Sequence, residues 1–303
     1  MIYTPQLQFN YIQIPPKTKP NQEQTLNTAT PSSTLGDNMA NILSFVSIKG
    51  GVGKTTLALE TATSLAKNFD KKVLLIDANF SAPNIGLYLD LTSDLTLHDA
   101  LDGTLLHNTI YEAHGIDIVP ASMEYEKEVD PFKLKKLLQK YKTRYDFIII
   151  DSSPNYEELK PVIAASDKIF LVTSPDHVTL QTTLKAAKIA KEQNTPIQGI
   201  IVNKIRSPKH EYNLEEIENI SEVPVLAKIR DHKKMAEALS AKTPITILDE
   251  FNIISKEIEK LASAICGSPE KTGWFQKLLP FKKIIQKQKI NRQLLRHEFY
   301  KSS

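Results

Sequence analysis

Two lysines and three glycines lie close together in the stretch KGGVGKTT, which runs from Lys49 to Thr56. Glycines let backbone N–H groups approach an anion closely, and successive N–H groups in such a loop form a cradle for phosphate oxygens. A lysine in the same loop adds a positive charge, and a threonine hydroxyl can coordinate Mg²⁺. This pattern predicts a loop that binds phosphate, and it leaves one lysine more than that task requires.

A buried strand and an amphipathic helix must hold this loop. The apolar segment 41–48 has the pattern of the strand, and residues 53–69 have the spacing of a helix. The helix N-terminus would then add partial positive charge to the phosphate site. Lys54 is expected to reach the β- and γ-phosphates of a nucleotide, while Thr55 binds Mg²⁺ and Thr56 contacts the α-phosphate. The predicted nucleotide-binding residues of the loop are Gly50, Gly51, Val52, Gly53, Lys54, Thr55 and Thr56.

Two aspartates stand at the ends of further apolar strands. Asp151 ends the strand in DFIIIDSS, and Asp77 ends the strand in KVLLIDA. The carboxyl ends of parallel strands meet at one edge of a sheet, so both carboxylates are expected near the phosphate loop. Asp151 would hold Mg²⁺ through water, and Asp77 would begin a loop, residues 77–86, that crosses the γ-phosphate, with Asp77 as a second candidate metal ligand. The alternative for each is a solvated turn at a strand end.

The order of elements predicts the fold. Strands alternate with helices along most of the chain, which favours right-handed crossovers and an α/β fold: a doubly wound, mostly parallel sheet with helices on both faces, a Rossmann-like three-layer sandwich. We divide the chain into an N-terminal extension (1–40), one domain (41–266), and a linker with a basic amphipathic helix (267–303). We expect the extension to be disordered because it has few large apolar groups. Further strands are predicted at 115–121, 168–175, 197–204 and 223–229, and helices at 131–145 and 250–266.

Composition excludes several classes of protein. The chain of 303 residues has one cysteine, so neither an intramolecular disulfide nor a CxxC metal site can form. No apolar run reaches the roughly 18 residues of a transmembrane helix, and no signal peptide is visible, so we expect an intracellular protein. The formal charge is +3, but residues 268–303 hold nine basic and two acidic residues, a net +7, which leaves −4 on the rest. A basic tail on an acidic body indicates an anionic partner for the tail.

These motifs together resemble a known family. KGGVGKTT, LLIDAN and DFIIIDSSP are similar to the motifs of the deviant Walker A ATPases, the MinD/ParA group of the SIMIBI P-loop NTPases, and the resemblance covers Asn41–Cys266. It implies ATP and Mg²⁺ as cofactors and an ATP-dependent homodimer with two nucleotides between the subunits. It also gives the extra lysine a role, because Lys49 would reach across the dimer to the partner's ATP. The residues that the resemblance assigns to catalysis are Lys49, Lys54, Asp77 and Asn79.

Three more positions carry over from the family. VNKI puts Asn203 where the family recognises adenine, and Asp231 lies in a segment that resembles the one closing over the base. Asp176, after a proline, matches an acidic position near the dimer interface. The structural alternatives are a strand-end cap for Asn203 and a helix N-cap for Asp231.

Position 79 departs from the family pattern. The family reads Asp-x-Asp here, and its second aspartate orients the attacking water, whereas this chain has Asn79. An amide can position water but cannot accept its proton. We therefore expect ATP hydrolysis that is slow or that depends on a partner protein. A structural use of Asn79 as a turn residue is the alternative.

The tail combines apolar and basic residues at helical spacing. GWFQKLLPFKK resembles the C-terminal membrane-targeting helix of MinD proteins, and lysines flank its apolar stripe, which suits an anionic membrane surface. The alternatives are packing against the body or a protein partner, and binding to nucleic acid, which such an apolar stripe favours less. The residues predicted to contact the membrane are Trp274, Phe275, Leu278, Leu279, Phe281 and Ile285.

The sequence thus favours a MinD-like ATPase. It would be cytoplasmic and peripherally associated with the inner face of the cell membrane, and it would position other proteins in the cell. Its expected protein partner is an unidentified activator or cargo protein. The first alternative is a ParA-like partition ATPase on non-specific DNA, which the net acidic body disfavours. A slowly hydrolysing, nucleotide-gated scaffold is the second. The missing CxxC argues against cluster-carrying relatives, and a tail without a tyrosine cluster argues against a bacterial tyrosine kinase.

Overall fold

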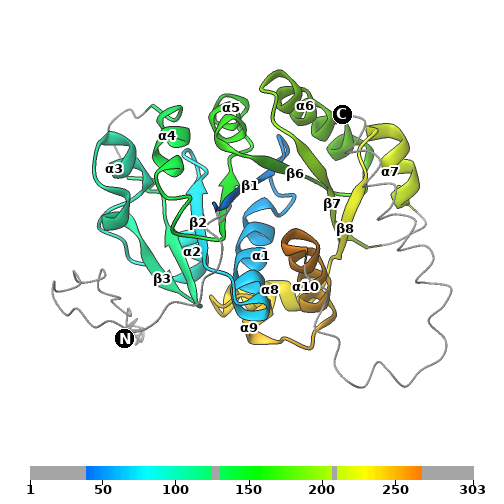
Figure 1. Ribbon diagram of the computed structural model, residues 1–303. Helices are drawn as coiled ribbons and strands as arrows, with labels where there is room; N and C mark the ends of the chain where they lie inside the picture. Colours follow the sequence, from blue (N-terminus) through cyan, green and yellow to red (C-terminus); the bar gives the residue numbers. More distant parts are fainter. Residues whose placement is uncertain (1–38, 125–129, 207–209, 268–303) are drawn as a thin grey trace, which may run out of the picture.

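The computed structural model describes residues 39–124, 130–206 and 210–267. In this part of the chain, eight strands form one sheet in the order β3-β4-β2-β5-β1-β6-β7-β8 (Figure 1). Every neighbouring pair is parallel except β3 and β4, which are antiparallel. The strands are β1 Asn41–Val46, β2 Val73–Ala78, β3 Tyr111–Ala113, β4 Ile116–Val119, β5 Phe147–Ser152, β6 Lys168–Thr173, β7 Ile197–Ile205 and β8 Val225–Arg230.

Helices cover both faces of this sheet, as Figure 1 shows. One face carries α1 Lys54–Phe69, α2 Ile85–Leu89, α8 Lys233–Ser240, α9 Ile245–Leu248 and α10 Ile253–Cys266. The other carries α3 Leu97–Asp102, the 3₁₀ turn Leu106–Thr109, α4 Lys133–Gln139, α5 Tyr156–Ala165, α6 His177–Glu192 and α7 Leu214–Ser221. Because both faces are covered, the central strands consist almost wholly of buried residues, as parallel strands in such folds require. The predicted α/β sandwich is confirmed.

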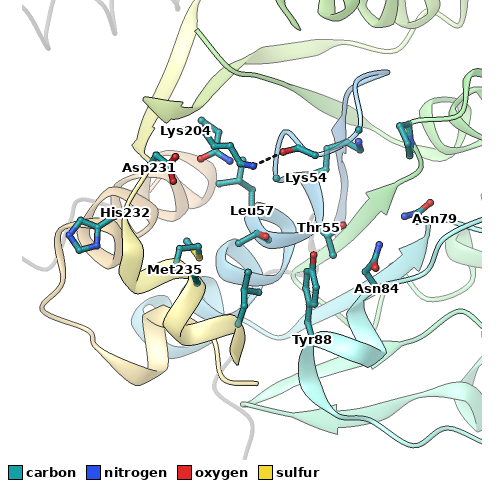
Figure 2. Close-up of a pocket in the computed structure, with 18 of the residues that line it drawn as sticks. Lys54, Thr55, Leu57, Asn79, Asn84, Tyr88, Lys204, Asp231, His232 and Met235 are labelled. Atoms are coloured by element: carbon teal, nitrogen blue, oxygen red, sulfur yellow. Dashed lines mark hydrogen bonds between the residues drawn. The ribbon is translucent and has the colours of Figure 1, made fainter. Parts of the chain in front are cut away.

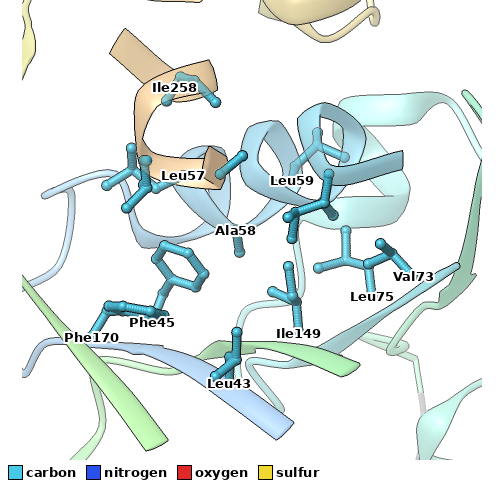
Figure 3. Close-up of a cluster of buried hydrophobic side chains, with 14 of the residues drawn as sticks. Leu43, Phe45, Leu57, Ala58, Leu59, Val73, Leu75, Ile149, Phe170 and Ile258 are labelled. Atoms are coloured by element: carbon cyan, nitrogen blue, oxygen red, sulfur yellow. The ribbon is translucent and has the colours of Figure 1, made fainter. Parts of the chain in front are cut away.

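The helix α1 packs on the centre of the sheet and fixes the loop that precedes it (Figure 3). Its buried side chains, among them Leu57 and Ala58, meet Phe45 of β1 and Ile149 of β5 in one apolar cluster. Phe45 also packs against Phe170 of β6, with ring centroids 5.4 Å apart. Burial of such side chains contributes about 1.5–3 kcal/mol each. The start of α1 is therefore held rigidly at the carboxyl edge of β1.

A buried carboxylate ties α1 to the helices beside it. The Glu60 side chain accepts hydrogen bonds from the N–H groups of Ile245 (2.7 Å) and Thr246 (3.1 Å), which begin α9, and from the Thr246 hydroxyl. Burial raises the pKa of Glu60, and these three hydrogen bonds oppose that shift. The carboxylate thus satisfies N–H groups that a helix start leaves without intrahelical partners.

Two expectations about the fold need correction. The sequence analysis predicts no strand directly before 115–121, but the short strand β3 lies there and pairs with β4. The helix predicted at 131–145 runs only from Lys133 to Gln139, and Phe132, its N-cap, is 59% exposed. Residues 140–145 form turns that bring Tyr141 and Tyr145 into the core instead.

Some expectations concern residues outside the described part. The N-terminal extension lies there up to residue 38, and so does the tail 268–303 with its predicted membrane-contacting side chains. The three-part division of the chain stays a prediction. Among the helices that are described, none combines the length and the apolar character needed to span a bilayer.

Candidate functional site

A pocket of about 520 Å³ opens at the carboxyl edge of the sheet, between the start of α1, the α2 segment and helix α8 (Figure 2). Its volume lies in the range of sites that hold nucleotide-sized ligands. Most of the residues predicted to bind nucleotide line it, together with several that were not predicted. The lining residues from the prediction are Gly50, Gly51, Gly53, Lys54, Thr55, Thr56, Asn79, Asn203 and Asp231.

The phosphate loop between β1 and α1 has the backbone that the glycines predict. Gly51 and Gly53 have φ of 76° and 93°, a region that favours glycine. Gly53 is the N-cap of α1 and provides no side-chain cap, so no side chain satisfies the first N–H groups of α1. Val52 is buried and packs in the core. These N–H groups and the helix dipole suit an anion such as phosphate.

The two lysines of the loop differ sharply in environment. Lys54 is buried, lines the pocket, and its Nζ donates to the backbone carbonyl of Lys49 at 3.3 Å. Burial lowers the pKa of Lys54, and the charge of Asp151 opposes that shift. The side chain of Lys49 is exposed and has no ion pair or hydrogen bond among the described residues. Of the two loop lysines, Lys54 therefore lines this pocket and Lys49 does not.

Thr55 and Asp151 are the residues that the sequence predicts to hold Mg²⁺ together. The Thr55 hydroxyl donates to Asp151 Oδ2 at 2.6 Å, so α1 and β5 bring the two side chains together. Asp151 is fully buried, and its Oδ1 has no hydrogen-bond partner. Burial, and then the charge of Asp77, raise the pKa of Asp151 to about 8. A buried carboxylate oxygen with no partner, beside a hydroxyl, is a donor set that fits Mg²⁺.

This metal site would be incomplete without a ligand. Within the described ranges, no group of three or more His, Cys, Asp or Glu side chains could hold a metal ion. Mg²⁺ is commonly bound by one or two protein oxygens together with waters and substrate phosphates. The residues here fit that mode, in which Thr55 and Asp151 hold the ion against the phosphates of a nucleotide.

Asp77 lies beside Asp151 but already has partners. The two aspartates occupy paired positions on β2 and β5. Asp77 accepts hydrogen bonds from the N–H groups of Asn79 at 3.2 Å and of Asn84 and Ile85 at 3.0 Å each. Burial raises the pKa of Asp77 to about 6. Its carboxylate therefore shapes the loop after β2 and caps α2, which a solvated turn would not do.

Asn79 has one satisfied and one unsatisfied polar atom. Its Nδ2 donates to the carbonyl of Ala82 within the same loop, and its Oδ1 is buried with no partner. The turn-stabilising role left open by the sequence is therefore present. The free oxygen belongs to a residue that lines the pocket, so the side chain can also accept a hydrogen bond from a bound water or ligand.

At the far end of the pocket, β7 and β8 supply the predicted base-binding residues. Asn203 lies inside β7, so it does not cap a strand end, and its Nδ2 donates to the carbonyl of Val52 at 2.8 Å. Asp231 pairs with Arg206 at 2.5 Å. The helix N-cap proposed as the alternative for Asp231 is in fact His232, which accepts from the N–H of Lys234.

Asp176, expected near a dimer interface, is the N-cap of α6 and accepts from the N–H of Thr179 at 2.9 Å. Its predicted interface role stays a prediction.

Two of the pocket residues that the sequence analysis did not predict are Lys204 and Tyr88. Lys204 has φ of 58°, and its Nζ donates to the carbonyl of Gly51 at 2.7 Å, so it holds the phosphate loop from the side of β7. Tyr88 of α2 lines the pocket near Thr55 (Figure 2). Lys204 follows Asn203 directly, which could have suggested it, whereas nothing in the sequence around Tyr88 signals its position.

Comparisons with known proteins agree with this geometry. The model of the CobQ/CobB/MinD/ParA nucleotide binding domain family matches residues 43–245. An uncharacterised ATP-binding protein of Methanocaldococcus jannaschii is 31% identical over 236 residues, which cover 76% of this chain and 89% of that protein. The chromosome-partitioning ATPase Soj of Treponema pallidum is 30% identical over 248 residues, covering 75% of this chain and 97% of Soj.

Among solved structures, one similar chain is the septum site-determining protein MinD of Pyrococcus horikoshii, complexed with Mg-ADP. It is 28% identical with a TM-score of 0.71, and the match covers 75% of this chain and 96% of that one. The matched family domain spans the phosphate loop, both strand-end aspartates and Asn203. On these grounds the chain belongs to the CobQ/CobB/MinD/ParA nucleotide-binding domain family.

Proposed function

We propose that this protein is an ATP-dependent dimerising switch that binds an anionic membrane surface through its C-terminal tail and positions another protein in the cell. ATP with Mg²⁺ would occupy the pocket, two subunits would enclose two nucleotides, and hydrolysis would return the subunits to monomers. The localisation that goes with this proposal is the cytoplasm, with peripheral association at the inner face of the membrane.

The family and the pocket support the nucleotide part of this proposal. Its relatives include proteins described as ATP-binding, as a partitioning ATPase, and as a MinD bound to Mg-ADP. In this chain, Lys54 and the α1 N-terminus face the pocket, and the unpartnered Oδ1 of Asp151 supplies an oxygen for Mg²⁺. Bound Mg²⁺ would neutralise charge that develops on the phosphates during hydrolysis.

The single observation that supports the proposed dimer is the contrast between the two lysines of the phosphate loop. Lys54 is buried in its own pocket, whereas the Lys49 side chain is exposed and without a partner among the described residues. An exposed cation at a phosphate loop is suited to stabilise phosphate charge on a second subunit, as arginine fingers do in trans. A Lys49→Ala variant is expected to bind ATP but to stay monomeric.

Hydrolysis is proposed to be slow or partner-stimulated. Asn79 occupies the place of the usual second aspartate, and its amide cannot take a proton from water. Its free Oδ1 can still orient that water. An activator protein, or the cargo that the dimer carries, would then determine how long the ATP-bound state lasts.

Co-sedimentation with vesicles tests the whole proposal. The full chain and a chain ending at Gly267 are each mixed with vesicles of anionic lipid, in ADP and in ATP with Mg²⁺. The expected result is pelleting of the full chain in ATP only, and none after truncation, because two tails in one dimer bind far more tightly than one. Lys49→Ala should pellet as weakly as the ADP state. Pelleting of neither chain in any state would contradict the membrane proposal.

The basic face of α4 favours a second candidate function, a ParA-like ATPase that binds DNA. Lys135, Lys136 and Lys140 are exposed on or just after this helix, and no ion pair engages them among the described residues. They provide local positive charge on a body that is net acidic. Salt-sensitive binding to random DNA that persists in the chain ending at Gly267, and that Lys135→Glu with Lys136→Glu removes, would establish this alternative.

A further inference from the structure

Tyr88 is a pocket residue that neither the family motifs nor the sequence patterns single out. Its ring is half-buried and packs against the apolar cluster under α1. Figure 2 shows the hydroxyl end of the side chain directed toward Thr55, the residue that pairs with Asp151 at the metal half of the pocket. The ring is thus anchored in the core while the polar end faces the ligand space.

The short helix that carries Tyr88 is held at both of its ends. The Asp77 carboxylate accepts from the N–H groups of Asn84 and Ile85 at its start. At its end, Asp90 forms an ion pair with Lys242, which follows α8. The Tyr88 N–H donates to the carbonyl of Asn84 at 2.9 Å. Because α2 is fixed by a buried carboxylate and by a link to the opposite pocket wall, the hydroxyl is pre-positioned before a ligand binds.

The hydroxyl has no hydrogen-bond partner in the described part of the chain, and the half-buried ring leaves it open to the pocket that Tyr88 lines. Burial, and then the negative charges of Asp151 and Asp77, raise the pKa of Tyr88. The group therefore stays a neutral O–H donor throughout the physiological pH range. A donor that points into a pocket without an internal acceptor is suited to an acceptor brought by the ligand.

We propose that the Tyr88 hydroxyl donates a hydrogen bond to the Mg²⁺-bound nucleotide, on an oxygen beside Thr55. That oxygen belongs either to a phosphate or to a water in the Mg²⁺ shell; both are electron-rich acceptors. This inference rests on the proposed nucleotide site and adds to it a contact from α2. It gives the chain a way to sense the Mg²⁺–nucleotide from the same helix that Asp77 caps.

Calorimetric titration of the full chain tests this contact. Wild type, Tyr88→Phe and the control Tyr156→Phe are titrated with ADP in Mg²⁺ and with ADP in excess chelator. Tyr156 lies on α5 with Lys160 over its ring and does not line the pocket. Loss of one hydrogen bond is expected to weaken Mg-ADP binding of Tyr88→Phe by about 3- to 10-fold, and of Tyr156→Phe not at all.

The chelator arm separates the two acceptors. Weakening of Tyr88→Phe in both conditions indicates a phosphate oxygen, and weakening in Mg²⁺ alone indicates a metal-bound water. Equal Mg-ADP affinity of wild type and Tyr88→Phe overturns the inference while leaving the nucleotide site intact. A wild-type chain that binds no Mg-ADP overturns both the inference and the proposed function.

Thermal unfolding without nucleotide provides the second measurement. The hydroxyl has no internal partner, so Tyr88→Phe should unfold at the wild-type temperature. A clearly lower unfolding temperature would mean that the hydroxyl bonds within the protein, which also overturns the proposal.

Discussion

The two ends of the pocket are built in different ways. The phosphate end stands on the central strands β1, β2 and β5, and its charged groups Lys54, Asp77 and Asp151 are buried. The base end stands on β7 and β8 at the margin of the sheet, where the side chains of Arg206 and Asp231 are 69% and 37% exposed. One end is fixed by the core, and the other is open to solvent.

The difference indicates which end of the pocket contributes more to the free energy of ligand binding. At the phosphate end, buried charges lack full compensation until Mg²⁺ and phosphate arrive, so ligand binding relieves an unfavourable state. At the base end, an exposed ion pair contributes only about 0–1 kcal/mol and can rearrange at little cost. Substitutions at the two ends should therefore differ greatly in effect.

Removal of the Lys54 charge should have the largest effect on binding. In Lys54→Ala the phosphates lose a charge-assisted hydrogen bond in a buried site, so the Kd for ATP should rise on the order of 100-fold. Isothermal calorimetry measures this, with Lys71→Ala as the matched control, because Lys71 follows α1 and does not line the pocket. A change below about fivefold would show that the backbone cradle alone binds the phosphates.

Asp151→Asn should change both the Mg²⁺ dependence of ADP binding and the pH dependence of the unfolding free energy. The raised pKa of Asp151, about 8 against an unfolded value near 4, means that the folded chain binds a proton more tightly than the unfolded chain. The unfolding free energy of the empty wild type should therefore fall as pH rises from about 4 to 8, by on the order of 5 kcal/mol. The variant should show a flatter profile and lose the enhancement of ADP binding by Mg²⁺.

Denaturant titrations at several pH values measure this profile. The exposed Asp94 is the control, since Asp94→Asn should leave both the profile and the Mg²⁺ dependence unchanged. Asp77, whose pKa is raised to about 6, should contribute the residual slope that remains in Asp151→Asn. A wild-type stability that increases over this range would contradict the account of buried, uncompensated carboxylates.

Asn79→Asp is expected to raise the steady-state ATPase rate by about tenfold, because a carboxylate can accept the proton of the attacking water. The same change removes the Nδ2 donation to Ala82, so stability should fall by about 1 kcal/mol. A phosphate-release assay and a melting curve record the two effects. An unchanged rate with the stability loss would assign Asn79 to the turn alone.

The smallest effect is expected at the base end. Asp231→Asn should change the Kd for ATP by a factor of about two or less, because its partner is the exposed Arg206. Arg206→Gln should behave alike in the same calorimetric titration. A loss of tenfold or more in either variant would mean that the pair closes over the base, and the contrast between the two ends would no longer hold.

The sequence was most informative where structure is local. The phosphate loop could be predicted because glycine geometry, the lysine and the helix start all lie within eight residues. The partners of Asp77 could not, because its N–H donors come from a loop whose path depends on packing. Tyr88 could not be predicted as a pocket residue, because its place depends on how α2 packs against α1. The strand β3, at three residues, was too short to leave an alternating pattern in the sequence. Phe132 shows that helical spacing misleads at a helix boundary, because α4 begins one residue after it, at Lys133.

The strand order has a consequence for synthesis on the ribosome. Among the described residues β1 is the first strand made, yet its neighbours in the sheet are β5 and β6, and β5 also separates it from β2. Since β1 pairs with β5 across Asn41 and Phe147, about 100 further residues must be translated first, which takes roughly 5–20 seconds. During that time β1 has no neighbouring strand to pair with, although β2, β4 and β3 can already pair with one another. The nascent chain therefore exposes the apolar strand β1 until Ser152 emerges.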